Sequence, residues 1–252
     1  MENEITAKHL ELHRNILREL GYTLTPGARI LDFGCGAGRM VSAYRRIGYE
    51  SYGCDLTMTE KSDLIRPIPK DSYSIPFPDN WFDFVYSDQV LEHVQDHDLV
   101  FAEIYRVLKA GGVSLHSFPS RLKPTESHLL VPLGGLIQNR FWLTLWALLG
   151  IRNSFQAGKG FREVVDLNDN YLKDRTNYLS KAEISKAVSA YFPNPTFAEE
   201  YMIKHSYGKA RHIYPLVKRV PFVASLYSSF YGRVILFQKP PSISQSSEYF
   251  ED

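Results

Sequence analysis

Short apolar runs and helix-spaced apolar positions alternate along the first half of the chain. The apolar runs predict buried strands, at residues 28–33, 49–54, 82–86 and 113–118. The stretches with apolar residues at every third or fourth position predict helices, at residues 4–20, 39–47 and 98–108. Strands that alternate with helices are typical of a parallel sheet covered on both faces. The pattern therefore predicts an α/β, doubly wound fold.

The alternation stops near residue 120 and resumes at a helix start near residue 180. Ser180 and Glu183 have the spacing of a capping box, which predicts a helix over residues 181–191. Two closing strands, 197–205 and 233–239, are expected to pair antiparallel. We therefore expect a seven-stranded, mostly parallel, Rossmann-like sheet within a single domain.

The domain prediction covers residues 1–239 and includes two segments outside the core pattern. These segments, 121–178 and 207–231, are interpreted as insertions that form a cap or lid on the acceptor side. Residues 240–252 are rich in Ser, Pro and acidic residues, which predicts a disordered tail.

The first insertion contains an apolar stretch, 129–151, that approaches the length of a membrane span, about 20 residues. Polar residues at 138–140 would be costly inside a bilayer, so a membrane-resting helix is the minority interpretation. The preferred one is a helix over 140–150 within a lid, with Trp142, Leu145 and Trp146 facing inward. A packed cap without ligand contact is the alternative.

Charge and cysteine content narrow the functional classes. Lys plus Arg (29) and Asp plus Glu (28) leave a formal net charge of +1, so no excess of positive charge points to nucleic acid. Two cysteines provide neither a disulfide framework nor a paired zinc motif, and no HExxH motif is present. The first residues are charged and lack a signal-peptide core, so a cytoplasmic location is expected.

The strongest chemical signal lies where the first predicted strand meets its helix. The sequence there is Ile30-Leu-Asp-Phe-Gly-Cys-Gly-Ala-Gly38. Glycines at such a turn let a ligand approach the backbone. The spacing departs from GxGxxG because Arg39 stands where the third glycine would fall. Asp32 would repel a pyrophosphate but suits a cationic amino-acid ligand.

Acidic residues also follow the next predicted elements. Asp55 ends the second strand, about 20 residues past the glycine turn, where a carboxylate can accept from both hydroxyls of an unphosphorylated ribose. A helix N-cap is the other role weighed for this residue. Asp71 can accept from an adenine amino group, and the Ser72 backbone amide can donate to the ring.

Five motifs in order make residues 28–120 resemble the class I S-adenosylmethionine-dependent methyltransferases, in the branch with type 11 domains. They are Asp32-Phe-Gly-Cys-Gly-Ala-Gly38, Asp55, Ile75-Pro-Phe-Pro-Asp-Asn-Trp-Phe-Asp83, Ser87-Asp-Gln-Val-Leu-Glu-His-Val94 and Arg106-Val-Leu-Lys-Ala-Gly-Gly112. Ala110 and Ile75 stand where the family usually has proline and leucine.

The resemblance implies S-adenosylmethionine as cofactor and assigns residues to its parts. The methionine part would be surrounded by Asp32, Gly34, Cys35 and Gly36, with Ser87 beside its end. Asp55 and Leu56 would hold the ribose and flank the adenine, whose edge would face Asp71 and Ser72. Cys35 is interpreted as a small packed residue rather than a nucleophile.

Two histidines are candidate general bases. His93 follows the strand predicted at residues 82–86, and an imidazole titrates near neutral pH, but a structural histidine bonded to backbone fits equally. His128 lies beyond the carboxyl end of another strand, with Arg121 and Glu126 as candidates for acceptor recognition. A solvated loop is the alternative there.

The sequence therefore predicts methyl transfer to an oxygen, nitrogen or carbon of a small, apolar or planar acceptor. Two other classes remain open: a non-catalytic cofactor-binding module that acts as a protein-interaction partner, and a nicotinamide oxidoreductase. The Gly38-Arg39 spacing and Asp32 argue against the oxidoreductase.

Overall fold

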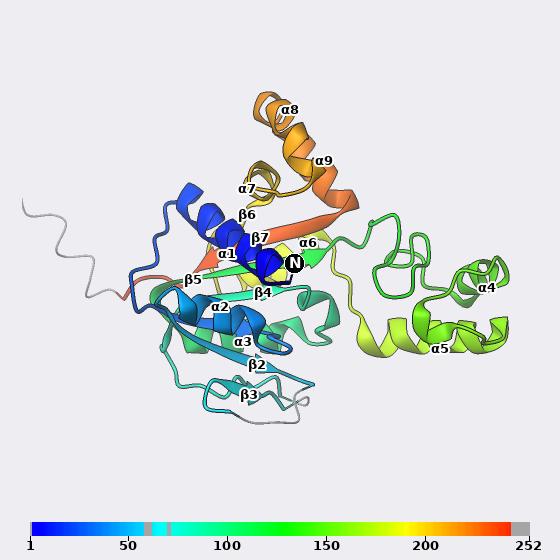
Figure 1. Cartoon of the computed structure of the whole chain (residues 1–252), viewed down its shortest axis with the longest axis horizontal. Helices are drawn as coiled ribbons and strands as arrows, with labels where there is room; N and C mark the ends of the chain where they lie inside the picture. The colour runs from blue at the N-terminus through cyan, green and yellow to red at the C-terminus, as the bar shows by residue number, and fades with distance from the viewer. Residues whose placement is uncertain (1, 58–61, 70–71, 243–252) are drawn as a thin grey trace, which may run out of the picture.

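Seven strands form one sheet in the computed structural model, which describes residues 2–57, 62–69 and 72–242 (Figure 1). Along the sheet the order is β3-β2-β1-β4-β5-β7-β6. The strands are β1 (Arg29–Phe33), β2 (Glu50–Asp55), β3 (Ile65–Pro67), β4 (Phe82–Asp88), β5 (Leu108–Pro119), β6 (Thr196–Phe197) and β7 (Gly232–Gln238). The five strands β3, β2, β1, β4 and β5 are parallel, and β7 is antiparallel to both of its neighbours. The predicted fold class is confirmed.

Helices cover both faces of this sheet. One face carries α1 (Glu2–Glu19), α2 (Arg39–Arg46) and α7 (Glu199–Lys204), and the other carries α3 (His97–Val107) and α6 (Lys181–Ser189). Successive side chains of a strand point to opposite faces, so a strand covered twice is apolar throughout. In β1, Ile30 packs under α1 and α2, while Leu31 belongs to the core under α3 and α6.

The central position of β1 determines where a ligand can bind. β1 pairs with β2 on one side and with β4 on the other, because the chain runs from β1 to β2 and β3 and then returns to the opposite side of β1 at β4. In open α/β sheets, ligands bind beyond the carboxyl ends of the strands at such a switch point. Asp32 lies opposite Tyr86 in the β1–β4 register, close to this edge.

The first insertion forms a helical unit with its own small core, and it projects away from the sheet in Figure 1. It contains α4 (Arg140–Leu148), the 3-10 helix η2 (Ser154–Gln156) and α5 (Phe161–Arg175). Trp142 and Trp146 are partly buried against this core, as predicted. Leu145 is 38% exposed, so its predicted inward orientation is wrong. Leu143 and Ala147, one turn apart, complete the inward stripe instead.

Near the carboxyl end, one prediction is confirmed and one is wrong. The capping box of Ser180 and Glu183 is present at the start of α6. Of the strand predicted over 197–205, only Phe197 is in a strand, because the chain enters α7 at Glu199. Ala198 and Met202, about one helical turn apart, pack together into the core on that face of the sheet. The chain continues through the 3-10 helix η3 (Lys209–Ile213), α8 (Tyr214–Arg219) and α9 (Phe222–Phe230).

Within the described residues, no helix is both long and apolar enough to cross a bilayer. Most of the tail predicted to be disordered, residues 243–252, lies outside them.

Candidate cofactor site

The glycine turn after β1 is shaped by close packing from two other segments. Gly34 has a φ of +83°, and a Cβ there would lie 2.3 Å from a methyl carbon of Val90. A Cβ on Gly38, at φ +71°, would lie 2.2 Å from Cδ1 of Ile65. Both positions therefore require glycine on conformational and steric grounds. The Gly34 and Cys35 amides donate to the Cys54 carbonyl, at 2.8 and 3.1 Å, which fixes the turn against β2.

Asp55 lies at the end of β2, where the sequence places it, and its carboxylate holds the turn. Its Oδ2 accepts from the Gly36 amide at 2.8 Å. Its Oδ1 accepts from the amide and the hydroxyl of Thr57, both at 2.7 Å. A carboxylate has about four lone-pair positions, so one acceptor position remains for a ligand. The structure brings Gly36 and Asp55 together, and ribose binding by Asp55 stays a prediction.

A cavity of about 560 Å³ opens beside this turn at the carboxyl ends of β1 and β4. Its lining residues come from α1, the glycine turn, α2 and β4: Ile5, Thr6, His9, Asp32, Gly34, Cys35, Arg39, Met40, Tyr86 and Asp88. Of the predicted cofactor residues, Asp32, Gly34 and Cys35 line it. A volume of this size is in the range of small-molecule sites.

Asp32 and Asp88, two carboxyl groups whose pKa values are shifted in opposite directions, face this cavity. Together with His13 and Tyr86 we call them the cavity cluster. Burial raises the pKa of Asp32 to about 7, and the nearby Tyr86 hydroxyl and His13 only partly oppose that shift. Burial also works against ionisation of Asp88, but His13, 3.1 Å away, and a hydrogen bond from Ser117 hold its pKa at about 2. The cavity therefore combines a permanent negative charge with a carboxyl group that titrates near neutral pH.

The other predicted cofactor residues lie outside the cavity lining. The Ser87 hydroxyl is fully buried and lies 2.7 Å from Nδ1 of His116, within the sheet. Leu56 packs partly against the α3 side of the core, and Ser72 is exposed. Asp71 falls outside the described residues. Burial raises the pKa of the Cys35 thiol, in keeping with a packed residue rather than a nucleophile.

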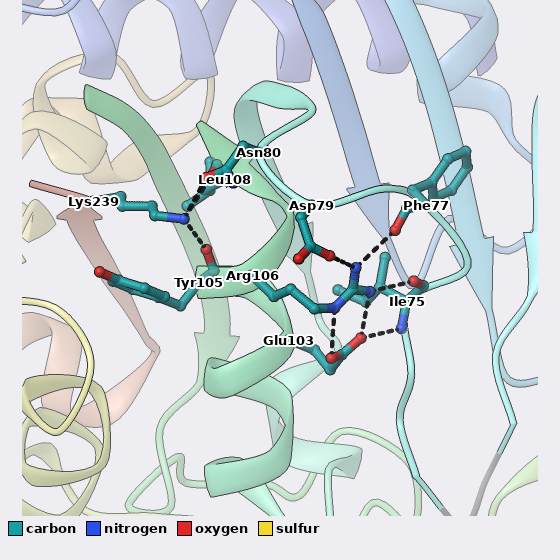
Figure 2. Close-up of polar contacts among 9 residues, drawn as sticks. All are labelled: Ile75, Phe77, Asp79, Asn80, Glu103, Tyr105, Arg106, Leu108 and Lys239. Carbon is teal, nitrogen blue, oxygen red and sulfur yellow. Dashed lines mark hydrogen bonds and ion pairs between the residues drawn. The ribbon is translucent and has the colours of Figure 1, made fainter. Parts of the chain in front are cut away.

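The loop that follows Ser72 is held in place by α3 (Figure 2). Arg106 donates to the carbonyls of Ile75 and Phe77, at 2.7 and 2.9 Å, and to Asp79 at 2.6 Å. Glu103 accepts from the Ile75 amide and from Arg106, both at 2.7 Å. Two of the five motifs, 75–83 and 106–112, therefore act as parts of one structural connection.

A lysine that directly follows β7 closes the end of that connection. Lys239 donates to the carbonyls of Tyr105 and Leu108 and to the Asn80 side chain, at 2.7 to 2.9 Å (Figure 2). The loop near the predicted adenine position is thus held by Arg106 of α3 and by Lys239 after β7.

The two candidate bases meet elsewhere, where the first insertion joins the sheet domain. The rings of His93 and His128 lie 4.8 Å apart. Nδ1 of His93 is 2.7 Å from the Arg175 carbonyl, and Nδ1 of His128 is 2.9 Å from Glu126. Glu126 also accepts from the Tyr178 hydroxyl at 2.6 Å. We call these residues, together with Glu92, the junction cluster.

The junction cluster contains groups whose pKa values differ strongly. Burial opposes ionisation of Glu126, but hydrogen bonds from His128, Tyr178 and two backbone amides lower its pKa to about 2. The bond to Glu126 raises the pKa of His128, whereas burial lowers that of His93. Burial raises the pKa of Glu92 to about 7, and neither of its oxygens has a hydrogen-bond partner.

Little space accompanies these groups. The cavity beside Glu92 and Tyr178 measures about 10 Å³, which is room for about one water molecule. Arg121, the remaining candidate for acceptor recognition, lies 3.6 Å from Glu183 of α6. None of these residues lines the large cavity, and the catalytic roles of His93 and His128 stay predictions.

The cavity residues that come from α1 and from the end of β4 are not among the residues predicted from the sequence. His9 and His13 are spaced by four residues on a predicted helix, so they lie on one face of it. Asp88 directly follows Ser87, the residue that the family resemblance places beside the methionine part of the cofactor. The helical spacing was the available signal, but only the fold shows that this face of α1 meets β4.

Comparison with known proteins supports the motif assignment. A family model described as a methyltransferase domain matches residues 31–115. Over 107 residues the chain is 36% identical to a sterol 24-C-methyltransferase of Schizosaccharomyces pombe, covering 36% of this chain and 27% of that protein. Over 138 residues it is 33% identical to a ubiquinone/menaquinone biosynthesis C-methyltransferase of Vibrio cholerae, covering 45% and 53%.

The fold also aligns with a solved structure, that of a Haemonchus contortus phosphoethanolamine N-methyltransferase in complex with S-adenosylhomocysteine. The alignment covers 90% of this chain and 52% of that protein's chain, at 19% identity and a TM-score of 0.49. The chain thus matches about a quarter to half of the length of the curated relatives named above. Residues 31–115 match a methyltransferase domain, in agreement with the resemblance drawn from the motifs.

Proposed function

We propose that this chain transfers a methyl group from S-adenosylmethionine to a small-molecule acceptor. The observation that carries the proposal is the Asp32 carboxyl, 5% exposed, on the wall of a cavity of about 560 Å³ beside a turn that only glycine can form. A family match over the same segment supports it. The two relatives are named as carbon methyltransferases, one of them acting on sterols.

The residues of the cavity fit this cofactor. Its amino-acid end carries an ammonium group and its sulfur carries a positive charge, and an ionised Asp32 beside Asp88 would stabilise both. The cofactor supplies a methyl group already activated on sulfur. The chain then has to align the acceptor and exclude water, and Ile5, Met40 and Tyr86 provide apolar walls for this.

A general base is needed only when the acceptor loses a proton on attack. The described structure offers two places for one. His9 lines the cavity, and His13 is paired with Asp88 at its wall. His93 and His128 occupy the junction cluster instead. An apolar or planar acceptor remains part of the proposal, because aromatic side chains are frequent in both insertions.

Calorimetric titration with S-adenosylhomocysteine tests the cofactor, with NAD as the control ligand. We expect micromolar binding, about −8 kcal/mol, of S-adenosylhomocysteine only. Asp32→Asn should weaken it by about 1–3 kcal/mol through lost charged interactions, whereas Asp174→Asn, an exposed carboxylate on α5, should leave it unchanged. Binding of NAD alone would support an oxidoreductase and contradict the proposal.

Turnover is tested separately with radiolabelled S-adenosylmethionine and an acceptor panel that includes a sterol and a quinone precursor. Methyl incorporation into any member supports the enzyme. Tight binding of S-adenosylhomocysteine without incorporation into extracts or panel compounds would favour a non-catalytic cofactor-binding module.

A further inference from the structure

The second insertion presents an exposed apolar stripe. Phe222, Leu226 and Phe230 of α9 follow one another at intervals of four residues, so they share one side of the helix. They are 68%, 45% and 45% exposed. The opposite side of α9 is already used, because Ala224 and Ser228 are buried. An exposed apolar stripe opposite the buried side of a helix is typical of a surface that contacts a partner.

The preceding helix extends the same kind of surface. Leu216 and Val220, at the same four-residue interval, are 52% and 44% exposed, while Val217 is fully buried in the local core. Tyr231, just after α9, is 54% exposed. We call these six exposed residues the α8–α9 face: Leu216, Val220, Phe222, Leu226, Phe230 and Tyr231.

Charge identifies the partner. Residues 201–242 contain no Asp or Glu. Lys209, Arg211, Lys218 and Arg219 in this segment are exposed, and no ion pair involves any of them within the described part of the chain. Apolar and aromatic side chains interspersed with unpaired Lys and Arg are typical of helices that lie in the interface of an anionic membrane.

We propose that the α8–α9 face docks this protein on the surface of an anionic lipid bilayer. The helices lie on the membrane rather than across it, since α8 and α9 contain six and nine residues. A second copy of the chain fits less well, because a two-fold contact through this face would bring together two copies of a segment, residues 201–242, that contains no acidic residue. The proposal involves residues 207–231, not the 129–151 stretch that the sequence alone brings to attention.

The position of the face also fits a role in acceptor access. The Leu12 amide of α1 donates to the Tyr207 hydroxyl at 2.9 Å, and α1 supplies Ile5, Thr6 and His9 to the cavity wall. Tyr207, at the start of the insertion that carries the α8–α9 face, therefore contacts the helix that lines the candidate cofactor site.

Vesicle co-sedimentation of the whole chain tests the proposal, using phosphatidylcholine with and without phosphatidylglycerol. We expect binding only to the anionic vesicles, weakened by salt. A Lys218→Gln/Arg219→Gln variant should bind roughly 30-fold more weakly, because each of the two lost charges contributes about fivefold. The matched variant Arg45→Gln/Arg46→Gln on α2 should bind like the wild type. No binding to anionic vesicles, or equal losses in both variants, would overturn the proposal.

A second measurement does not depend on weakening the fold. Phe222→Trp should show a blue shift of fluorescence on anionic vesicles that exceeds the response of the wild type. The absence of that extra shift would contradict insertion of the α8–α9 face. Light scattering completes the test: a dimer in solution that Phe222→Ser abolishes would assign the face to a second copy and overturn the membrane proposal.

Discussion

The cavity cluster and the junction cluster contain similar groups in different surroundings. Both combine a carboxyl group whose pKa is about 7, Asp32 or Glu92, with a carboxylate held at a pKa of about 2, Asp88 or Glu126. The cavities beside them measure about 560 Å³ and about 10 Å³. Perturbed pKa values mark functional sites and structural networks alike. Space for a ligand, rather than titration, distinguishes the two clusters.

From this difference we expect the cavity cluster to bind a ligand and the junction cluster to attach the first insertion to the sheet domain. At the junction, the Asn177 amide donates to the Glu92 carbonyl at 2.7 Å, so backbone as well as side chains join the insertion to the sheet domain. A substitution at the junction should therefore act first on stability, and one at the cavity first on affinity.

Glu126→Ala is expected to have the largest effect. Its carboxylate is 2% exposed and accepts from His128, Tyr178 and the Leu129 amide. Removing it leaves several buried donors unpaired, so we expect a loss of about 3 kcal/mol in the free energy of unfolding. Urea denaturation measures this loss. Glu163→Ala, at an exposed pair with Lys159, is the control and should cost less than about 1 kcal/mol. Equal losses would remove Glu126 from any structural role.

Arg106→Ala tests whether the loop held by α3 belongs to the cofactor site. The guanidinium makes several charged hydrogen bonds but is 30% exposed, so we expect a stability loss of about 2 kcal/mol. If the loop contacts the adenine, affinity for S-adenosylhomocysteine should fall as well, with partial recovery in Arg106→Lys. Reduced stability with unchanged affinity would show that the loop is only structural.

The sequence predicts those features of the fold and the site that are encoded by residues close together along the chain. The glycine turn and Asp55 were located correctly because a strand end, a turn and a helix start are encoded within a few residues. β3 was missed because three residues show no periodicity, and α7 was predicted as a strand because Tyr201, Met202 and Ile203 form a short apolar run. The contact between His13 and Asp88 joins residues 75 positions apart along the chain, and no local pattern encodes it.

The pH dependence of binding should sharpen the contrast at the cavity. The pKa of Asp32 is raised to about 7 by burial, so this carboxyl group is largely neutral below that pH. The ammonium group of S-adenosylhomocysteine should favour the ionised form of Asp32, so affinity should fall toward tenfold, about 1.4 kcal/mol, for each pH unit below 7. Calorimetry from pH 5.5 to 8.5 measures it, and Asp32→Asn should flatten the profile. A flat wild-type profile would show that the ligand does not engage Asp32.

His93→Asn is expected to have the smallest effect, and it decides between the two roles considered for this residue. Nδ1 of His93 faces the Arg175 carbonyl at 2.7 Å, and burial lowers the pKa of the ring, so at neutral pH the ring is uncharged and this nitrogen donates. An asparagine amide can replace that donor, so stability should change by about 1 kcal/mol or less. A general base contributes roughly 10²–10⁴-fold to the rate. The measurement is kcat with any acceptor that turns over. A kcat within about tenfold of wild type assigns His93 to the junction cluster. A loss of 100-fold or more at unchanged cofactor affinity would make His93 the base and place the acceptor beside the first insertion.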